Sequence, residues 1–403
     1  MARRSTAEWG IRAALALVVS AIGYVSVTHS LANVIKKPDP ERAHALAPQD
    51  GRITALLARK LFTPEARPVQ RAKSARLAQL ALRQDATAVP AVATLGIQAQ
   101  LRGDTKMARR IFSYSQKLSR RDLESQLWAI EDAVGRSDIE GALRHYDITL
   151  RTSHKAPDLL YPVLGSAISD PAIRIALVKT LAGKPPWGPS FTNYVAANGA
   201  DPRSVNDLFQ KLRQAGIPVS EEATAISLKW LITRGFADEA WRSYTSAHPG
   251  ADPRRSRDPQ FAANIAYPSP FDWTPVNDDS VSTSIQRDVR GGIFDFAAPP
   301  SVGGTLLQQI QILPPGDYRI EGHSTGIDQP IASAPYWVLS CYDGRELGRV
   351  ILPNSAQAKG VFTGRFSVPS GCPVQTLALV ARPSDDVSGV AGQIDRIQLA
   401  PVQ

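Results

Sequence analysis

The segment RAALALVVSAIGYVSV, residues 12–27, decides where this chain folds, because fifteen apolar or small residues follow its arginine without interruption. Arg3 and Arg4 precede the segment and Trp9 flanks it. A basic start followed by an apolar run is typical of a membrane-targeting segment. The sequence therefore predicts a cytoplasmic N-terminus and a body that is carried across a membrane.

Three interpretations of this segment are open. An anchor needs roughly 20 apolar residues, and residues 9–35 supply that length only if the polar residues between 28 and 33 are counted. A cleaved signal is the second interpretation, since Ser-Leu-Ala at residues 30–32 would serve as a cleavage site. A buried core helix is the third. We expect a single-pass anchor in a bacterial inner membrane, with the bulk of the chain in the periplasm.

Composition and charge narrow the class of protein. The 403 residues are 43% hydrophobic and 21% charged, as expected of a globular chain with room for two domains. Residues 261–403 hold 9 Lys and Arg against 13 Asp and Glu, so with +9 overall the charge is −4 there and +13 in residues 1–260. This excess favours an anionic partner such as phospholipid or acidic polysaccharide over nucleic acid, unless it is only a solvated surface.

The only two cysteines, Cys341 and Cys372, lie in the C-terminal region. In an oxidising compartment we expect them to pair, closing a loop of about 30 residues and contributing roughly 3–4 kcal/mol. Two buried free thiols are the alternative. Neither cysteine has a histidine or second cysteine at ligand spacing, so the sequence predicts no metal site, and no motif calls for a cofactor.

Residues 36–50 read as a proline-containing linker and residues 51–248 as amphipathic helices. A 34-residue offset relates Arg-Gly-Asp at 102–104 to Arg-Ser-Asp at 136–138, and each is followed by an alanine and an aromatic residue at matching positions. A turn, a small residue and an aromatic residue are what a stacked helix pair needs. The residues of the first copy resemble the tetratricopeptide repeat: Leu95, Gly96, Ala99, Gly103, Ala108 and Phe112.

The resemblance implies an α-solenoid with a concave groove for protein partners. We expect a degenerate array, because KPPWGPS at residues 184–190 breaks any helix. Basic residues are our candidates for the groove, and the alternative is that they are the solvated face of amphipathic helices. These candidates are Arg109, Arg110, Lys117, Arg120 and Arg121.

Residues 249–270 form a proline-rich boundary, after which the helical period disappears. About nine short β-branched runs in residues 271–403 predict an antiparallel sandwich of the jelly-roll type. The fold class is therefore α+β multidomain: transmembrane helix, α-solenoid, sandwich. The runs LPPGDYRI, PYWVLSC and GQIDRIQL resemble the galactose-binding-like jelly roll of carbohydrate-binding modules, which implies a glycan ligand.

A sugar site needs an aromatic face for the ring and polar groups for the hydroxyls. Strand alternation places Trp337, Leu339 and Cys341 on a core face and the flanking tyrosines on the other. Core packing is the alternative for each aromatic candidate. The candidates for ligand binding are Trp273, Tyr336, Tyr342, Asp295 and Arg319.

The sequence offers no catalytic constellation. Residues 322–326 have the letters G-x-S-x-G, but residues 327–335 cannot supply the helix that a nucleophile elbow requires. We therefore predict a non-enzymatic envelope scaffold or binding protein that acts in exopolysaccharide or cell-envelope assembly. Its helical repeats would engage envelope proteins, and its β-domain would bind glycan or protein. A glycan-active enzyme with an unrecognised site and a purely structural subunit are the alternatives.

Overall fold

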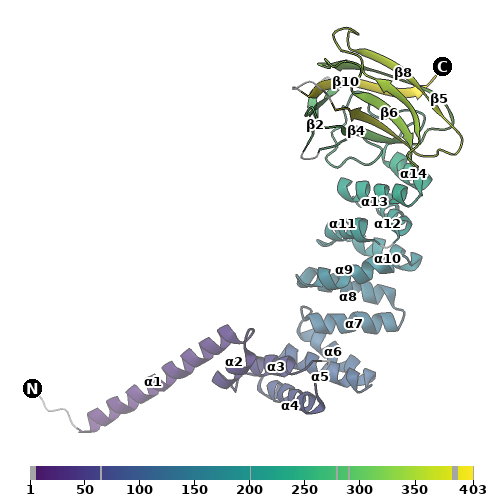
Figure 1. Cartoon of the computed structure of the whole chain (residues 1–403). Helices are drawn as coiled ribbons and strands as arrows, with labels where there is room; N and C mark the ends of the chain where they lie inside the picture. Colours follow the sequence, from purple (N-terminus) through teal and green to yellow (C-terminus); the bar gives the residue numbers. More distant parts are fainter. Residues whose placement is uncertain are drawn as a thin grey trace, which may run out of the picture. The chain divides into compact units, whose positions relative to one another are not determined.

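The computed structural model describes residues 6–63, 66–199, 201–277, 280–288, 291–383 and 389–402. These residues form fourteen helices followed by ten strands (Figure 1). The predicted α+β class is confirmed: an apolar N-terminal helix, a helical region and two antiparallel sheets. The chain divides into two compact units, Met1–Leu160 and Tyr161–Gln403, and the boundary falls inside helix α9 (Ala156–Ala167).

The first unit begins with the long apolar helix α1 (Thr6–Ile35), drawn in purple in Figure 1. Its segment Ala7–Ile35 is long and apolar enough to cross a membrane, with a mean hydropathy of 1.8 and none of the apolar window buried. Near its end the helix joins the folded unit, because Ala32 is fully buried and packs with Ala43 and Ile53. Most of α1 is thus an exposed apolar helix, and only its C-terminal end packs on the rest of the unit.

Aspartate side chains start many of the helices by accepting backbone N–H groups, which satisfies donors that a helix leaves unpaired. Asp50, Asp104 and Asp138 do so in the first unit. The other helices of this unit are α2 (Pro40–Leu46), α3 (Gly51–Lys60), α4 (Pro68–Gln84), α5 (Val89–Leu101), α6 (Thr105–Leu118), α7 (Leu123–Gly135) and α8 (Ile139–Thr152).

The 34-residue offset is a structural repeat. Helix pairs α5–α6 and α7–α8 are each joined by a turn with a left-handed residue, Gly103 at φ +79° and Ser137 at φ +57°. In both turns the next aspartate donates its N–H to an alanine carbonyl, at 3.0 Å and 2.9 Å. The alanine and aromatic positions of both copies are buried. The coarser prediction of packed helical hairpins is confirmed here.

The second unit continues with five helices and then the sandwich. The helices are α10 (Pro171–Ala182), α11 (Gly188–Asn198), α12 (Pro202–Gln214), α13 (Glu221–Thr233) and α14 (Ala237–Ala247). The α13–α14 turn uses the same device, with Gly235 at φ +83° and the Phe236 N–H donating to the Leu231 carbonyl at 2.8 Å. Repeated turns of this kind set helix against helix along the chain.

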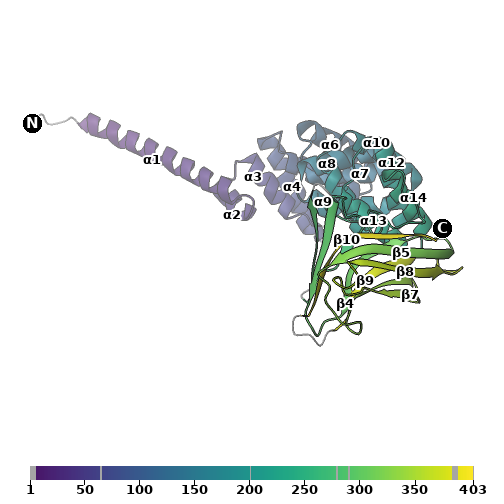
Figure 2. The same cartoon turned by 90° about the horizontal axis from the view of Figure 1, so that it is seen from above.

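Two five-stranded antiparallel sheets form the sandwich (Figure 2), in the orders β1-β4-β9-β6-β7 (sheet A) and β2-β3-β10-β5-β8 (sheet B). Alternate residues enter a single core, as Trp337, Leu339 and Cys341 do, which confirms their predicted face. The strands are β1 (Thr274–Pro275), β2 (Ser282–Asp288), β3 (Gly291–Ala298), β4 (Gly304–Gln311), β5 (Gly316–Thr325), β6 (Tyr336–Cys341), β7 (Glu346–Ile351), β8 (Val361–Val368), β9 (Gln375–Ala381) and β10 (Val390–Pro401).

The predicted disulfide is present. Cys341 at the end of β6 is bonded to Cys372, just before β9, and their Cα atoms are 5.7 Å apart. Because β6 and β9 are neighbours in sheet A, the bridge ties together the start of one strand and the end of the other. The apolar N-terminal helix, whether signal or anchor, and this disulfide together indicate an extracytoplasmic location.

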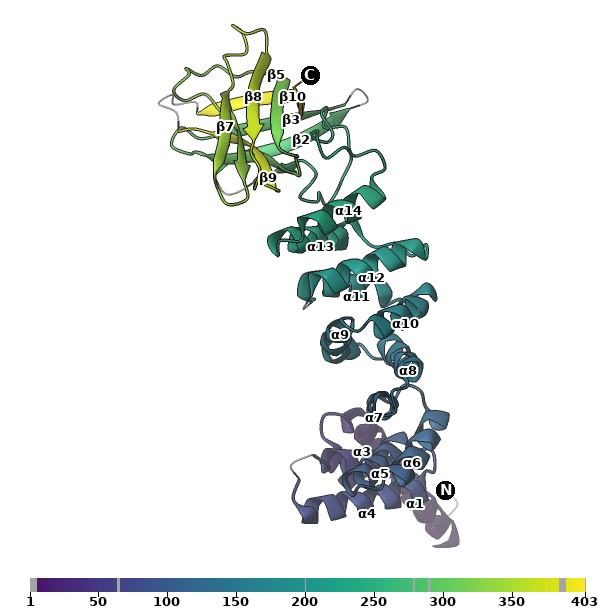
Figure 3. The ribbon, with the colours of Figure 1, turned by 90° about the vertical axis from the view of Figure 1, so that its right-hand side faces the viewer.

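The last helix pair packs directly on the sandwich (Figure 3). One apolar cluster joins residues of α13 and α14, such as Leu231 and Tyr244, to Phe271 and Val374 of the β region. The Tyr244 hydroxyl donates to the Asp272 carboxylate at 2.8 Å, and the Ser269 N–H and hydroxyl donate to the other carboxylate oxygen. Helix pair and sandwich are therefore one continuous folded body.

We expect Tyr244→Phe to lower the free energy of unfolding of the full chain by about 1.5–3 kcal/mol, because a buried carboxylate loses one of its donors while the ring packing stays. The measurement is urea unfolding followed by fluorescence. The exposed Tyr267→Phe serves as the matched control and is expected to change the value by less than about 0.5 kcal/mol. Equal effects of the two changes on stability would contradict the role of the Tyr244 hydroxyl as a donor to the buried Asp272 carboxylate.

Candidate binding site

A cavity of about 360 Å³ lies in the angle between α13 and the outer face of sheet A, and we call it the α13–sheet cleft. Helix α13, capped by the Ser220 hydroxyl, presents Ile226, Lys229 and Thr233 to it. These residues share one side of the helix because 3.6 residues complete a turn. With Ala225 and Ile232, which also line the cleft, the helix supplies three apolar and two polar side chains.

The sheet supplies the facing wall. Gln308 on β4 pairs with Thr274 on β1, and Ile310 on β4 pairs with Thr376 on β9, so the four side chains lie side by side. Alternation turns them outward, away from the sandwich core. Tyr342 completes the wall from the turn after β6.

Tyr342 is positioned by its own backbone. Its N–H donates to the Val374 carbonyl at 3.0 Å, and Gly344 at φ +88° closes the turn that follows. The side chain is 57% exposed and lines the α13–sheet cleft. With its backbone held in this way, Tyr342 presents a flat apolar ring beside solvent.

Three polar groups in the α13–sheet cleft are available to a ligand. The side chains of Lys229, Gln308 and Tyr342 make no hydrogen bond or ion pair to any part of the chain that the structure describes. Together they provide an ammonium donor, a carboxamide that both donates and accepts, and a phenol. The residues identified along the wall of the cleft include no aspartate, glutamate or histidine among the described positions.

The other aromatic candidates lie elsewhere. Trp273 is 4% exposed and packs in the sandwich core, 5.8 Å from Trp337 between ring centroids, and its indole N–H donates to the Asp258 carbonyl at 3.0 Å. Tyr336 is half-buried between two guanidinium groups, with Arg349 and Arg382 at 4.1 Å and 4.7 Å from the ring centroid. Both cations lie within cation–π distance of the ring, so a sugar ring would compete with them for its faces.

Asp295 and Arg319 lie on the outer face of sheet B. Asp295 accepts a hydrogen bond from the Gln393 amide at 2.7 Å, and Arg319 pairs with Glu321 at 3.1 Å. The structure thus separates the five predicted ligand residues into a core position, two positions on different parts of sheet A and a face of sheet B. Of the five, Tyr342 lines the α13–sheet cleft.

The predicted partner-groove residues lie on α6 and the residues that follow it. Arg109 is paired with Asp132 at 2.6 Å, and this guanidinium holds the pKa of the Asp132 carboxyl below its usual range. The other four side chains, Arg110, Lys117, Arg120 and Arg121, are exposed. On α6 the buried side is formed by Ala108, Phe112 and Ser115, so Arg110 and Lys117 point to the solvent.

Sequence reasoning missed Lys229, Gln308 and Thr376. Lys229 follows the helical pattern of an exposed position, and Gln308 and Thr376 follow the outward alternation of their strands. Each pattern was readable, but none indicates that a helix and a sheet distant in the sequence meet at these side chains.

Comparison with known proteins assigns this chain to no family. No family model matches this chain, and no curated protein matches it. The tetratricopeptide resemblance therefore has no support from a family model.

Similar solved structures include the enzymatically active domain of tailspike protein 4 of bacteriophage CBA120, with 12% identity, a TM-score of 0.24 and coverage of 32% of this chain and 19% of that chain. A chain of a glycosylation-associated protein complex from Streptococcus agalactiae has 12% identity and a TM-score of 0.21, and the match covers 30% of this chain and 39% of that chain. A carbohydrate-binding module of lichenase 5A from Cellvibrio mixtus, in complex with cellotriose, has 10% identity and a TM-score of 0.21. That match covers 32% of this chain and 92% of the module. This chain therefore spans well under half of the first two chains. The match to the module is distant, and it assigns neither an activity nor a ligand.

Proposed function

We propose that this chain is a membrane-anchored, non-enzymatic binding protein of the bacterial envelope, with its bulk in the periplasm. In this proposal the α13–sheet cleft holds a glycan while the helical region engages envelope proteins, as a scaffold in polysaccharide or envelope assembly would. The observation that carries the glycan part is the exposed Tyr342 ring beside the unpartnered side chains of Gln308 and Lys229. An apolar ring face and convergent polar groups are the chemistry that a sugar needs.

The lining of the α13–sheet cleft supports sugar over a purely apolar ligand. The isoleucines and prolines give a non-polar floor, while hydroxyls of Thr274 and Thr376 and the Gln308 amide stand along the sheet wall. Sugar hydroxyls both donate and accept, and so do these groups. The Lys229 ammonium adds a preference for a glycan that carries a carboxylate or another anionic substituent.

The same lining supports binding without chemistry. Glycoside hydrolysis uses two carboxyl groups that flank the scissile bond. The side chains that line the α13–sheet cleft within the described residues carry none, and their only ionised group is Lys229. A bound glycan would have an aromatic ring beside it and no carboxyl group among the lining residues that the structure describes.

An uncleaved anchor is supported by the end of α1. Ala32, the last residue of the Ser-Leu-Ala tripeptide, is helical and fully buried against Ala43 and Ile53. Cleavage after Ala32 would separate this residue from the residues that it packs against in the folded unit. The anchored form keeps α2 and α3 joined to their packing partner.

The experiment is a glycan-array screen of the detergent-solubilised full chain, followed by calorimetric titration of the best ligand against Tyr342→Ala. We expect binding to weaken about tenfold, since stacking of this size is worth about 1.4 kcal/mol. Tyr267→Ala is the matched control, because Tyr267 is 52% exposed and outside the α13–sheet cleft. A chain that binds no glycan, or a Tyr342→Ala variant that binds as well as the control, would leave only the protein-binding part of the proposal.

A further inference from the structure

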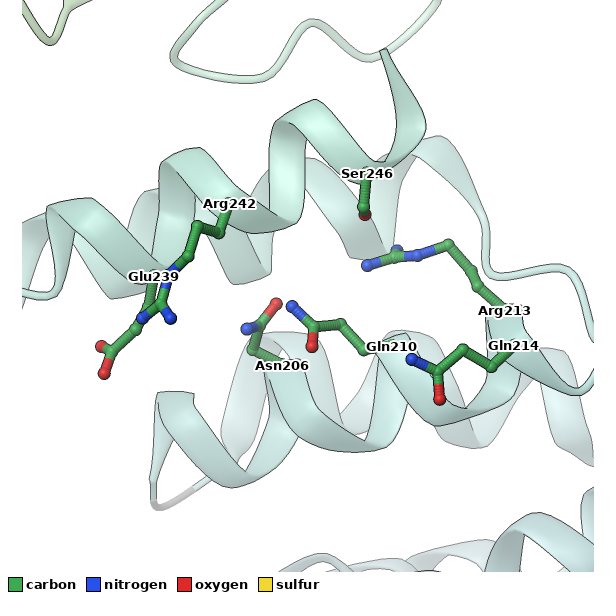
Figure 4. Close-up of a pocket in the computed structure, with 7 residues that line it drawn as sticks. All are labelled: Asn206, Gln210, Arg213, Gln214, Glu239, Arg242 and Ser246. Atoms are coloured by element: carbon green, nitrogen blue, oxygen red, sulfur yellow. The ribbon is translucent and has the colours of Figure 1, made fainter. Parts of the chain in front are cut away.

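A second hollow of about 520 Å³ lies between α12 and α14, and we call it the α12–α14 groove (Figure 4). The residues that line its walls all have polar or charged side chains. Carboxamides of Asn206, Gln210 and Gln214 stand on α12, while α14 contributes Arg242 and the Ser246 hydroxyl. The groove residues include no aromatic ring within the described part of the chain.

Two polar side chains in this groove have bonding capacity left over, and one of their atoms is buried. Asn206 is 8% exposed and points into the groove, and its side chain makes no hydrogen bond to the described residues. Glu239 accepts from Arg203 at 2.8 Å through Oε1, but its Oε2 is buried and unpaired in the described structure. Buried polar atoms are nearly always hydrogen-bonded, so the unpaired Glu239 Oε2, beside an Asn206 amide that faces the groove, points to a ligand that pairs it.

The groove also carries uncompensated positive charge. Arg213 is half-buried, and it donates from Nη2 to a neutral acceptor, the Ser243 hydroxyl, at 3.1 Å. Burial lowers the pKa of this guanidinium because no carboxylate offsets the lost hydration. Arg242 donates from Nε to the Asp238 carbonyl at 3.3 Å, again a neutral acceptor. Glu239, the one carboxylate among the lining residues that the structure describes, is already paired with Arg203.

We propose that the α12–α14 groove binds an extended, acidic segment of a partner protein. The carboxamides of Asn206, Gln210 and Gln214 stand four residues apart on one helix, about 6 Å per step. An extended chain repeats its outward-facing peptide groups every two residues, about 6.4–6.8 Å. Each carboxamide can donate to a peptide carbonyl and accept from a peptide N–H, so the spacing matches one amide per dipeptide.

The guanidinium groups set the charge of that segment. Arg213 and Arg242 are placed to take carboxylates of the peptide in bidentate pairs, and Glu239 Oε2 accepts a backbone N–H. Without an aromatic ring in the lining, the apolar face of a sugar has no surface to stack on. This inference names the partner chemistry of the helical region, and it rests on the proposal that this region engages proteins.

The test uses the full chain in lipid nanodiscs and two pools of octapeptides, one in which glutamate alternates with any residue and one in which glutamine replaces glutamate. We expect binders to be enriched from the glutamate pool. The best binder is expected to lose at least tenfold in affinity with Arg242→Gln and with Asn206→Leu. Arg234 is exposed and lies outside the groove, so Arg234→Gln is the matched control and is expected to bind as the unmodified chain does.

Other outcomes overturn the inference. Equal enrichment from the two pools, or a binder that is insensitive to Arg242→Gln, shows that the groove does not read acidic peptide. An oligogalacturonide that binds and is weakened by Arg242→Gln, with no peptide enriched, assigns the groove to an acidic glycan instead. Because Tyr342→Ala leaves the α12–α14 groove intact, peptide binding to that variant separates failure of this inference from failure of the glycan proposal.

Discussion

Replacing Arg257 by alanine is expected to lower the free energy of unfolding of the full chain by about 3–5 kcal/mol. Removing the buried guanidinium leaves the buried acceptors that it serves without a donor. Arg257 is 9% exposed and donates to the Phe271 carbonyl at 3.0 Å and to Gln311 Oε1 at 2.8 Å, and also to the Ile310 carbonyl. Its guanidinium lies 5.5 Å from the centroid of the Trp241 ring. Burial lowers the pKa of Arg257 to about 10, so it is still charged at neutral pH.

Urea unfolding followed by tryptophan fluorescence measures the effect. Arg255→Ala is the matched control, since Arg255 belongs to the same segment, is about half exposed and makes a loose ion pair with Asp252 at 3.8 Å. That change is expected to alter stability by less than about 0.5 kcal/mol. A loss below about 1 kcal/mol for Arg257→Ala would show that the helix pair and the sandwich do not depend on this residue.

Removing the disulfide with Cys341→Ser and Cys372→Ser together is expected to lower the free energy of unfolding by about 3–4 kcal/mol. The bridge spans 31 residues, and cross-linking a loop of this length restricts the unfolded chain by about that amount. The same urea titration, run with and without dithiothreitol, provides the check. Reductant should destabilise the natural chain and leave the double variant unchanged. Equal stability of the oxidised chain and the double variant would mean that the bridge adds nothing.

Periodicity and alternation in the sequence predicted much of the fold. The helices, the change to short strands after residue 270 and the core face of β6 followed from repeats of 3.6 and 2. The pairing of Cys341 with Cys372 followed from compartment and count. Helical periodicity and strand alternation are local patterns, so each can be recognised within a single segment of the sequence.

The binding site could not be predicted in the same way. Tyr342 was readable as an outward residue, but Lys229 and Gln308 meet it only because α13 packs against sheet A. Arg257 stands in the segment ADPRRSRDP, which reads as a charged linker, and no period separates it from its exposed neighbours Arg254 and Arg255. Tertiary packing alone decides which of these three arginines is buried.

The contact between the last helix pair and the sandwich limits where this chain can be cut or fused to another protein. A fragment that begins at Phe261 lacks Ser256, whose N–H donates to the Leu399 carbonyl at 3.0 Å, and lacks Arg257. It would also open Phe271 and Val374 to water. Transplanting the β-domain onto another protein should therefore fail unless α13 and α14 travel with it. The smallest part that can be moved to another protein is therefore the helix pair α13–α14 together with the sandwich.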